Sequence, residues 1–189
     1  MIVGLGNPGR AYAHSRHNMG SEVAREFSER HSIRLRRRGK LRSRIGVGEV
    51  DGRKVIVAIP TTFMNRSGEA VSRVVGFYGV HAKNLLVILD DVNLPLGRLR
   101  IRSKGSDGGH KGLRSVIACL GTMEFARLRI GIGRDESGSL TGFVLGDFST
   151  EEKTVIKGSI ERAAEVSDAV ISDGVASAMN RYNRPSEPD

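Results

Sequence analysis

Short apolar runs alternate with amphipathic segments along the chain, and this alternation restricts its possible folds more than any other feature. Residues 2–5 form an apolar run that ends in a turn-rich loop, and residues 84–90 form a longer run that predicts a strand buried on both faces. From Gly20 onward, and again over residues 67–78, apolar side chains recur at helical spacing. Strands that alternate with helices predict an α/β fold with a mixed central sheet and helices on both faces.

The remaining segments fit the same architecture. Asp51 and Gly52 form the commonest two-residue hairpin signature, so residues 45–50 and 53–60 are predicted to pair as antiparallel strands. Further predicted elements are a strand around Leu99 and Ile101 with a basic face (Arg98, Arg100, Arg102), a glycine-rich loop (104–109), helices (110–120, 151–171), a strand (127–133) and helical turns (175–182). Because no repeat or linker interrupts the pattern, residues 1–189 are predicted to form a single domain, with a short polar tail from about residue 184.

The charge balance favours a polyanionic partner. The chain has 30 Lys and Arg residues against 21 Asp and Glu residues, which gives a net charge of +9 and a pI of about 10.3. Seven of the eleven residues from Arg34 to Arg44 are basic, a density suited to phosphate contact. A solvated, flexible loop would explain this segment equally well, so its order and role stay open.

Several classes of protein are not expected. No apolar run approaches the roughly 20 residues that a membrane helix needs. The first residues do not resemble a secretory signal, so a cytoplasmic location is predicted. Cys119 is the only cysteine, which excludes internal disulfides and thiolate metal clusters, and it is predicted to be a small core residue.

Two segments match the spacing of familiar binding motifs but lack the neighbouring residues that these motifs need. Gly4, Gly6 and Gly9 match the spacing of the dinucleotide fingerprint, but Pro8 stands where a helix must open with free N–H groups toward pyrophosphate. His14 and His17 have the spacing of two metal ligands on a helix, yet no third ligand accompanies them. The serine hydrolase elbow and the phosphate-binding loop are both absent from the sequence. No metal site and no nucleotide cofactor are therefore predicted.

Unusual polar stretches follow the ends of predicted strands or lie in loops, where open α/β sheets gather their functional groups. Taken singly, each has an ordinary structural explanation: Asn7 as a turn residue, Asn65 as a helix N-cap, Asp90 as a loop carboxylate and His17 as a surface residue. The stretches are residues 6–9, 16–20, 60–68, 90–91 and 108–112.

Read together and in order, these stretches resemble the bacterial peptidyl-tRNA hydrolase family, from Ile2 to about Asn183. The resemblance implies a monomeric α/β enzyme without metal or organic cofactor that cleaves the ester between the peptide and the terminal ribose of tRNA. The blocks that carry it are GLGNPG (4–9), RHNMG (16–20), PTTFMNRSG (60–68), GGHKGL (108–113), RLRIGIG (127–133) and FVLG (143–146).

The resemblance implies a catalytic pair. His17 would activate the attacking water, and Asp90 would hold its imidazole in the basic tautomer. The chemistry agrees, because an imidazole can accept a proton at neutral pH and a carboxylate stabilises the imidazolium that forms. A histidine that acts through water needs no serine or cysteine nucleophile.

The resemblance also implies the substrate contacts. Asn7 and Asn65 would offer uncharged donors and acceptors to the peptide and the terminal nucleotide, and Asn7 would help to tell an N-blocked aminoacyl group from a free amine. Tyr12 and Phe63 could stack on bases of the acceptor end. Arg102 and Arg129 match the basic positions that bind tRNA phosphate in the family.

Lys111 departs from the family pattern, in which asparagine usually follows the histidine of the GGH block. The change replaces an amide that donates and accepts by a cation that only donates. A donor contact to the substrate could survive, whereas a water bound through the amide oxygen is put in doubt. Lys111 could equally add a phosphate contact.

Two other functions remain as alternatives. A non-catalytic RNA-binding protein on the same fold, like the plant organellar splicing factors that resemble this family, would suit the basic charge equally well. A pure binder would not require His17, Asp90, Asn7 and Asn65 together, which favours the enzyme. A dinucleotide-dependent oxidoreductase is a more distant alternative.

Overall fold

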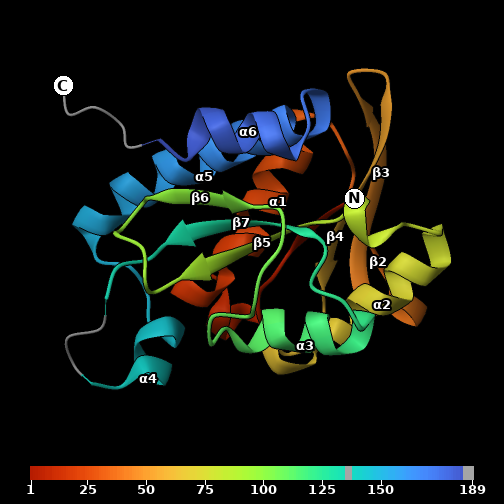
Figure 1. Ribbon diagram of the computed structural model, residues 1–189. Helices are drawn as coiled ribbons and strands as arrows, with labels where there is room; N and C mark the ends of the chain where they lie inside the picture. The colour runs from red at the N-terminus through yellow and green to blue at the C-terminus, as the bar shows by residue number, and fades with distance from the viewer. Residues whose placement is uncertain (135–137, 185–189) are drawn as a thin grey trace.

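The computed structural model describes residues 1–134 and 138–184 and builds a seven-stranded sheet in the order β2-β3-β4-β1-β5-β7-β6 (Figure 1). The central strands β4, β1, β5 and β7 are parallel, whereas β2-β3-β4 and β7-β6 pair antiparallel at the two edges. The predicted mixed sheet is confirmed. The strands are β1 (Ile2–Gly4), β2 (Arg36–Arg38), β3 (Ser43–Val50), β4 (Arg53–Pro60), β5 (Leu86–Asp91), β6 (Leu99–Arg102) and β7 (Ala126–Gly131).

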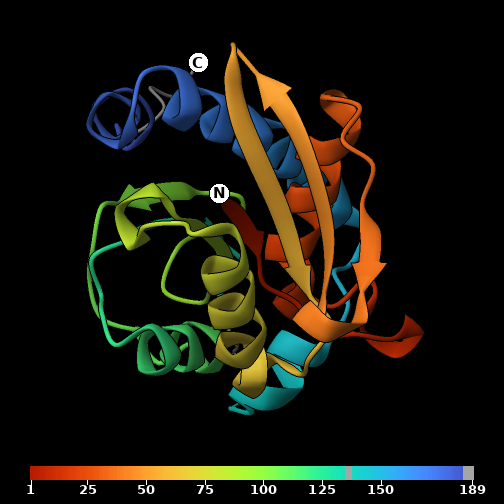
Figure 2. The same ribbon diagram turned by 90° about the vertical axis from the view of Figure 1, so that its right-hand side faces the viewer.

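Helices cover both faces of this sheet, as predicted. On one face α1 packs with α5 and α6, and on the other α2 packs with α3 (Figures 1 and 2). The short helix α4 lies near the start of α1, beside the carboxyl ends of the central strands. The helices are α1 (Met19–Arg30), α2 (Ser67–Tyr78), α3 (Lys111–Leu120), α4 (Leu140–Leu145), α5 (Thr150–Ser172) and α6 (Val175–Tyr182).

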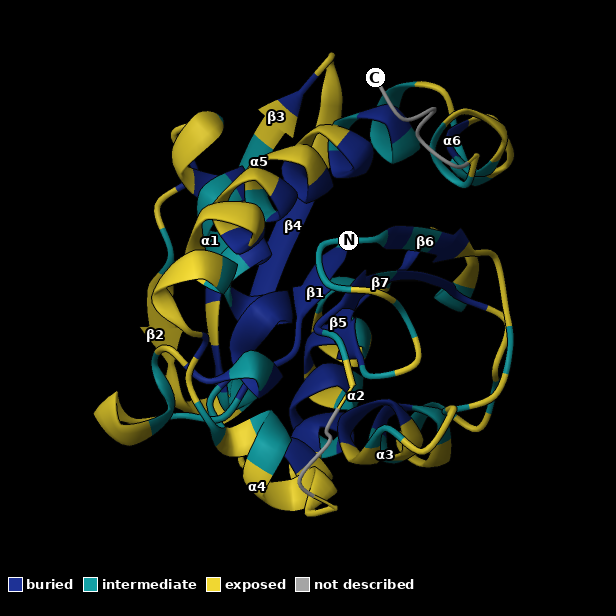
Figure 3. Cartoon of the chain, turned by 90° about the vertical axis from the view of Figure 1, so that its left-hand side faces the viewer, coloured by how far each residue is buried: buried dark blue, intermediate teal, exposed yellow. Residues whose placement is uncertain are grey.

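The core forms two layers, one on each side of the sheet (Figure 3). Alternate residues of β5 supply both layers: Ile88 faces the layer under α1 and α5, while Val87 and Leu89 face the layer under α2 and α3. This explains why residues 85–89 are continuously apolar rather than alternating. Among the described residues, no helix is long and apolar enough to cross a membrane.

Three features differ from the sequence expectations or were open in them. Arg36–Arg38 is an ordered edge strand rather than part of a flexible loop. Cys119 is exposed, so its prediction as a core residue was wrong: it lies near the end of α3, on the flank of the stripe that Leu113 and Val116 turn toward the sheet. The helix α4 was not predicted. The polar tail lies outside the described residues from 185 onward.

Gly68 allows α2 and α3 to pack closely, because a Cβ at this position would lie 2.0 Å from the Ser115 carbonyl oxygen. Backbone cannot give way as a side-chain tip can, so we expect Gly68→Ala to destabilise the fold by about 1–3 kcal/mol or more. Gly76→Ala, on the same helix with open space around it, should instead be neutral or stabilising by up to about 1 kcal/mol. Urea unfolding of both variants tests this, and equal midpoints would contradict it.

Candidate active site

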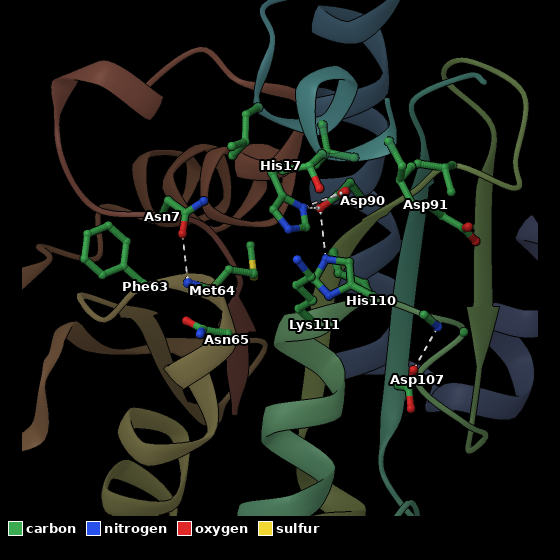
Figure 4. Close-up of a pocket in the computed structure, with 18 of the residues that line it drawn as sticks. Asn7, His17, Phe63, Met64, Asn65, Asp90, Asp91, Asp107, His110 and Lys111 are labelled. Atoms are coloured by element: carbon green, nitrogen blue, oxygen red, sulfur yellow. Dashed lines mark hydrogen bonds and ion pairs between the residues drawn. The ribbon is translucent and has the colours of Figure 1, made fainter. Parts of the chain in front are cut away.

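A pocket of about 570 Å³ opens at the carboxyl ends of β1 and β5. The loop after β1, the turn before α1, the loop before α2 and the start of α3 surround it (Figure 4). Gly20 brings α1 close to this edge, since a Cβ there would lie 2.1 Å from the Ile88 carbonyl oxygen. The polar stretches noted in the sequence therefore meet at one place.

His17 and Asp90 are in contact and buried. His17 lies in a 3₁₀ turn that leads into α1, and Asp90 lies in β5. The imidazole Nδ1 lies 3.0 Å from Asp90 Oδ1 and 2.9 Å from Oδ2. Because an ionised carboxylate can only accept, Nδ1 carries the proton and Nε2 is the ring nitrogen with a free lone pair.

His110 is a second imidazole on the same carboxylate, and sequence reasoning did not assign it a role. It is the N-cap of α3, where its Nδ1 accepts the Leu113 N–H at 3.1 Å. Its Nε2 therefore carries the proton and donates to Asp90 Oδ1 at 3.1 Å. The two rings lie 4.8 Å apart between centroids, and both point toward Asp90 (Figure 4). The available signal was a histidine at the first position of a predicted helix that begins in this polar cluster.

The Asp90 carboxylate is charged despite its burial. Loss of water alone would raise the pKa of this carboxyl, but electrostatic attraction and hydrogen bonds from the imidazoles of His110 and His17 together keep its pKa below the ordinary value. An ionised Asp90 can only accept hydrogen bonds, so it keeps both imidazoles in fixed tautomers.

The same three residues are the place where a metal could bind. Ligand atoms of His17, Asp90 and His110 lie within 4.8 Å of one another. The imidazole nitrogens already lie 2.9–3.1 Å from the carboxylate oxygens, and each of these nitrogens carries the proton of a hydrogen bond to Asp90. An ion would have to replace these imidazole–carboxylate hydrogen bonds.

Asn7 is fixed between two loops, which restricts what it can offer a ligand. Its side-chain Oδ1 accepts the Met64 N–H at 2.8 Å, and its backbone N–H donates to Asn18 Oδ1 at 2.7 Å. The side-chain NH₂ of Asn7 remains available at the pocket. The sequence predicts that this amide offers both a donor and an acceptor to the substrate, but its oxygen already accepts the Met64 N–H.

The aromatic residues and Asn65 line the side of the pocket near Asn7. Tyr12 and Phe63 meet edge to face with ring centroids 6.4 Å apart, and 56% of Phe63 is exposed. Asn65 is exposed and lies in the turn before α2, whose N-cap is Arg66 and not Asn65. Both aromatic rings and the Asn65 amide are therefore accessible from the pocket.

The three predicted basic residues have different surroundings. Lys111 is exposed at the first turn of α3 and lines the pocket. Arg129 also lines it, but its guanidinium is paired with Asp91 at 2.7 Å. Arg102 is exposed at the end of β6 and is not brought into the pocket.

Arg127 fixes the glycine-rich loop that precedes His110. It is buried, with 2% exposed, and it donates to the carbonyls of Gly105 and Ser106 from one nitrogen and to those of Met123 and Phe125 from another. The resemblance drew attention to Arg129 of the RLRIGIG block, whereas Arg127 of the same block supports the loop.

Arg16 connects the His17 turn to the helices α4 and α5. Its guanidinium lies 4.5 Å from the Phe143 ring centroid and 4.8 Å from that of Phe148, and it pairs with Glu152 at 2.6 Å. Glu152 is also the capping-box residue of α5. The FVLG block thus places α4, which carries the pocket residue Leu140, beside the RHN block.

Comparisons of the sequence and of the structure with known proteins identify the same family. The peptidyl-tRNA hydrolase family model matches residues 1–189. A peptidyl-tRNA hydrolase of Clostridium botulinum is 47% identical over 183 residues, 97% of this chain and 95% of the relative. One of Caldanaerobacter subterraneus is 46% identical over 183 residues, covering 97% and 98%. The crystal structure of a peptidyl-tRNA hydrolase from Acinetobacter baumannii matches with a TM-score of 0.92 at 35% identity and covers 96% of this chain and 93% of that one.

Proposed function

The chain belongs to the peptidyl-tRNA hydrolase family and hydrolyses the ester bond between peptide and tRNA, and from this premise we propose that His17 is its general base and Asp90 the residue that orients it. The observation that carries the proposal is the geometry of this pair: Asp90 binds the protonated Nδ1 of His17, which leaves Nε2 as an acceptor at the pocket. The non-catalytic RNA-binding alternative is not supported by the comparisons.

In the proposed reaction, water attacks the ester carbonyl while His17 Nε2 takes a proton from it. Asp90 stabilises the imidazolium across the Nδ1 hydrogen bond. When the carbon–oxygen bond to the ribose breaks, the imidazolium returns the proton to the leaving ribose oxygen. The products are a free peptide carboxyl group and a tRNA with a free terminal hydroxyl group, and His17 is regenerated as a base.

The direct test of the activity uses N-acetyl-aminoacyl-tRNA. We expect the protein to release N-acetyl-amino acid from it, and to act much more slowly on the same tRNA carrying a free amine. Burying an ammonium against the Asn7 amide NH₂, which can only donate, would leave both groups poorly paired. If pure protein failed to release N-acetyl-amino acid from the N-blocked substrate, the proposal would be wrong.

We further propose that the Asn7 amide NH₂ donates to the peptide, that Asn65 contacts the peptide or the terminal nucleotide, and that Tyr12 and Phe63 stack on acceptor-end bases. The support is that all four line the pocket that contains His17. Exposed aromatic rings suit single-stranded nucleotides because every base has a π-face. We propose that the enzyme acts as a cytoplasmic monomer without a cofactor.

Arg102 and Arg129 are proposed to bind phosphates of the acceptor stem. Because Arg129 is paired with Asp91, the two residues should contribute unequally to tRNA binding. Arg102→Ala should reduce the slope of log affinity against log salt by about 0.7–0.9, the value of one lost phosphate contact. Arg129→Ala should reduce it less, because Asp91 already neutralises this guanidinium. Titration with tRNA at several salt concentrations measures both slopes, and an unchanged slope in both variants would place the phosphates elsewhere.

Lys111 is proposed to contact phosphate as well. Lys111 is an exposed cation at the pocket, and without a bound anion its charge would oppose the imidazolium that forms during catalysis. Lys111→Asn should therefore raise KM, leave kcat nearly unchanged and make KM less sensitive to salt by about one contact. A selective change in kcat at both low and high salt would show instead that the residue acts on the reacting water.

A further inference from the structure

A second hollow, of about 580 Å³, lies beside the GLGNPG loop. It is bounded by this loop, the start of α1, and the strands β2, β3 and β4, and it shares only Asn7 with the pocket that contains His17. Four arginines line it, and none of the described residues that line it is acidic. We call this hollow the arginine groove; its arginines are Arg10, Arg25, Arg37 and Arg44.

Two of these arginines lie directly opposite each other in the sheet. Arg37 of β2 is the register partner of Arg44 of β3, so their side chains leave the same face. Like charges in such a cross-strand pair destabilise the sheet unless something neutralises them. The pair therefore has an electrostatic cost in the free protein that a bound anion would remove.

Few acidic side chains neutralise the arginines of the groove. Within residues 1–134 and 138–184, Arg10, Arg37 and Arg44 form no ion pair, and all three are exposed. Arg25 is partly neutralised by Glu22, at 3.3 Å. Arg42, between β2 and β3, is already paired with Glu69. Three guanidinium groups thus remain free around one concave surface.

We propose that the arginine groove binds phosphodiester groups of RNA, as a site separate from the active-site pocket. Guanidinium groups bind phosphate oxygens with paired N–H donors, and several in one hollow suit consecutive charges of a nucleic-acid backbone. The groove involves β2, at the opposite edge of the sheet from Arg102 in β6, with Asp90 of the central strand β5 between them. It would therefore engage RNA away from the acceptor-stem contacts. The inference goes beyond the proposed function, because binding there needs no hydrolysis.

The strand β2 offers a matched control. Arg36 and Arg38 flank Arg37 but point to the opposite face, since successive side chains of a strand alternate. The test compares Arg37→Ala/Arg44→Ala with Arg36→Ala/Arg38→Ala, which remove the same charge. Binding of deacylated tRNA and of an RNA duplex unrelated to tRNA is measured across salt concentrations for both. Thermal unfolding verifies that each variant is folded, and removal of the like-charge pair should not lower Tm.

The groove variant should bind RNA more weakly than the control, with a salt slope smaller by about 1.4–1.8, equivalent to two lost phosphate contacts. Loss confined to tRNA would identify the substrate tRNA as the source of the phosphates, and equal loss for the duplex would identify RNA in general; both support the groove. Equal slopes in the two variants for both RNAs would overturn it. So would weaker binding of poly-glutamate by the groove variant with RNA binding intact, because that result identifies an acidic peptide as the ligand.

Discussion

Replacing His17 with alanine is expected to lower kcat for N-acetyl-aminoacyl-tRNA at least about 100-fold, the usual contribution of a general base. The affinity for tRNA should change little, because His17 contacts Asp90 and its proposed role is to activate water rather than to bind phosphate. Measuring kcat and KM separately distinguishes this from a binding defect. His14→Ala is the matched control, since His14 is exposed and does not line the pocket.

The control should keep normal turnover. Near-normal kcat in His17→Ala would remove this residue from the mechanism. A large rise in KM with unchanged kcat would assign it to substrate binding instead.

Asp90→Asn is expected to have a larger effect than its small change in shape suggests, with kcat lower by about 10³–10⁴-fold, as for the corresponding change in serine proteases. Asp90 accepts an N–H from both His17 and His110. An amide has one oxygen for two such donors and presents its own N–H groups to one of them. His17 would then turn Nδ1 into the acceptor and protonate Nε2, which removes the base from the pocket.

Asp91→Asn makes the same chemical change one residue away and serves as the control. Asp91 pairs with Arg129 and contacts neither imidazole, so we expect a much smaller change in kcat. Circular dichroism and thermal unfolding should show that both variants are folded. Equal losses of kcat in the two variants would contradict a specific role of Asp90 in fixing the histidine tautomer.

Periodicity predicted most of the elements because local pattern and tertiary environment agree there. Residues 67–78 were predicted as a helix and form α2, and the turn at Asp51 and Gly52 joins β3 to β4 with both residues at positive φ. The strand Arg36–Arg38 was not predicted, because a run of arginines lacks any apolar alternation and becomes a strand only by pairing with β3. Edge strands depend on their neighbour more than on their own sequence.

The sequence was sufficient to predict which residues form the candidate site, but not the hydrogen bonds between them. The polar stretches and the family resemblance identified His17 and Asp90, and the fold brings them into contact. The sequence could not show that His110 shares the same carboxylate, because that depends on how the start of α3 packs against β5.

Hydrogen bonds and ion pairs with residues distant in the sequence also determine which polar atoms remain available to a ligand. Asn7 has its side-chain oxygen bound to the Met64 N–H, and Arg129 is neutralised by Asp91. Both partners come from other segments of the chain. Residue type and spacing state what a side chain can donate or accept, whereas only the tertiary structure shows which of these capacities is left for a ligand.

The measurement that tests the central claim most directly is the single-turnover rate of N-acetyl-aminoacyl-tRNA hydrolysis as a function of pH, in the natural protein and in His17→Ala. A protonated imidazole cannot accept a proton from water, so the rate of the natural protein should fall as the pH is lowered, with a limiting slope of one proton. The residual rate of His17→Ala should lose this acid limb. An acid limb that persists unchanged in His17→Ala would show that another group is the base and would contradict the mechanism.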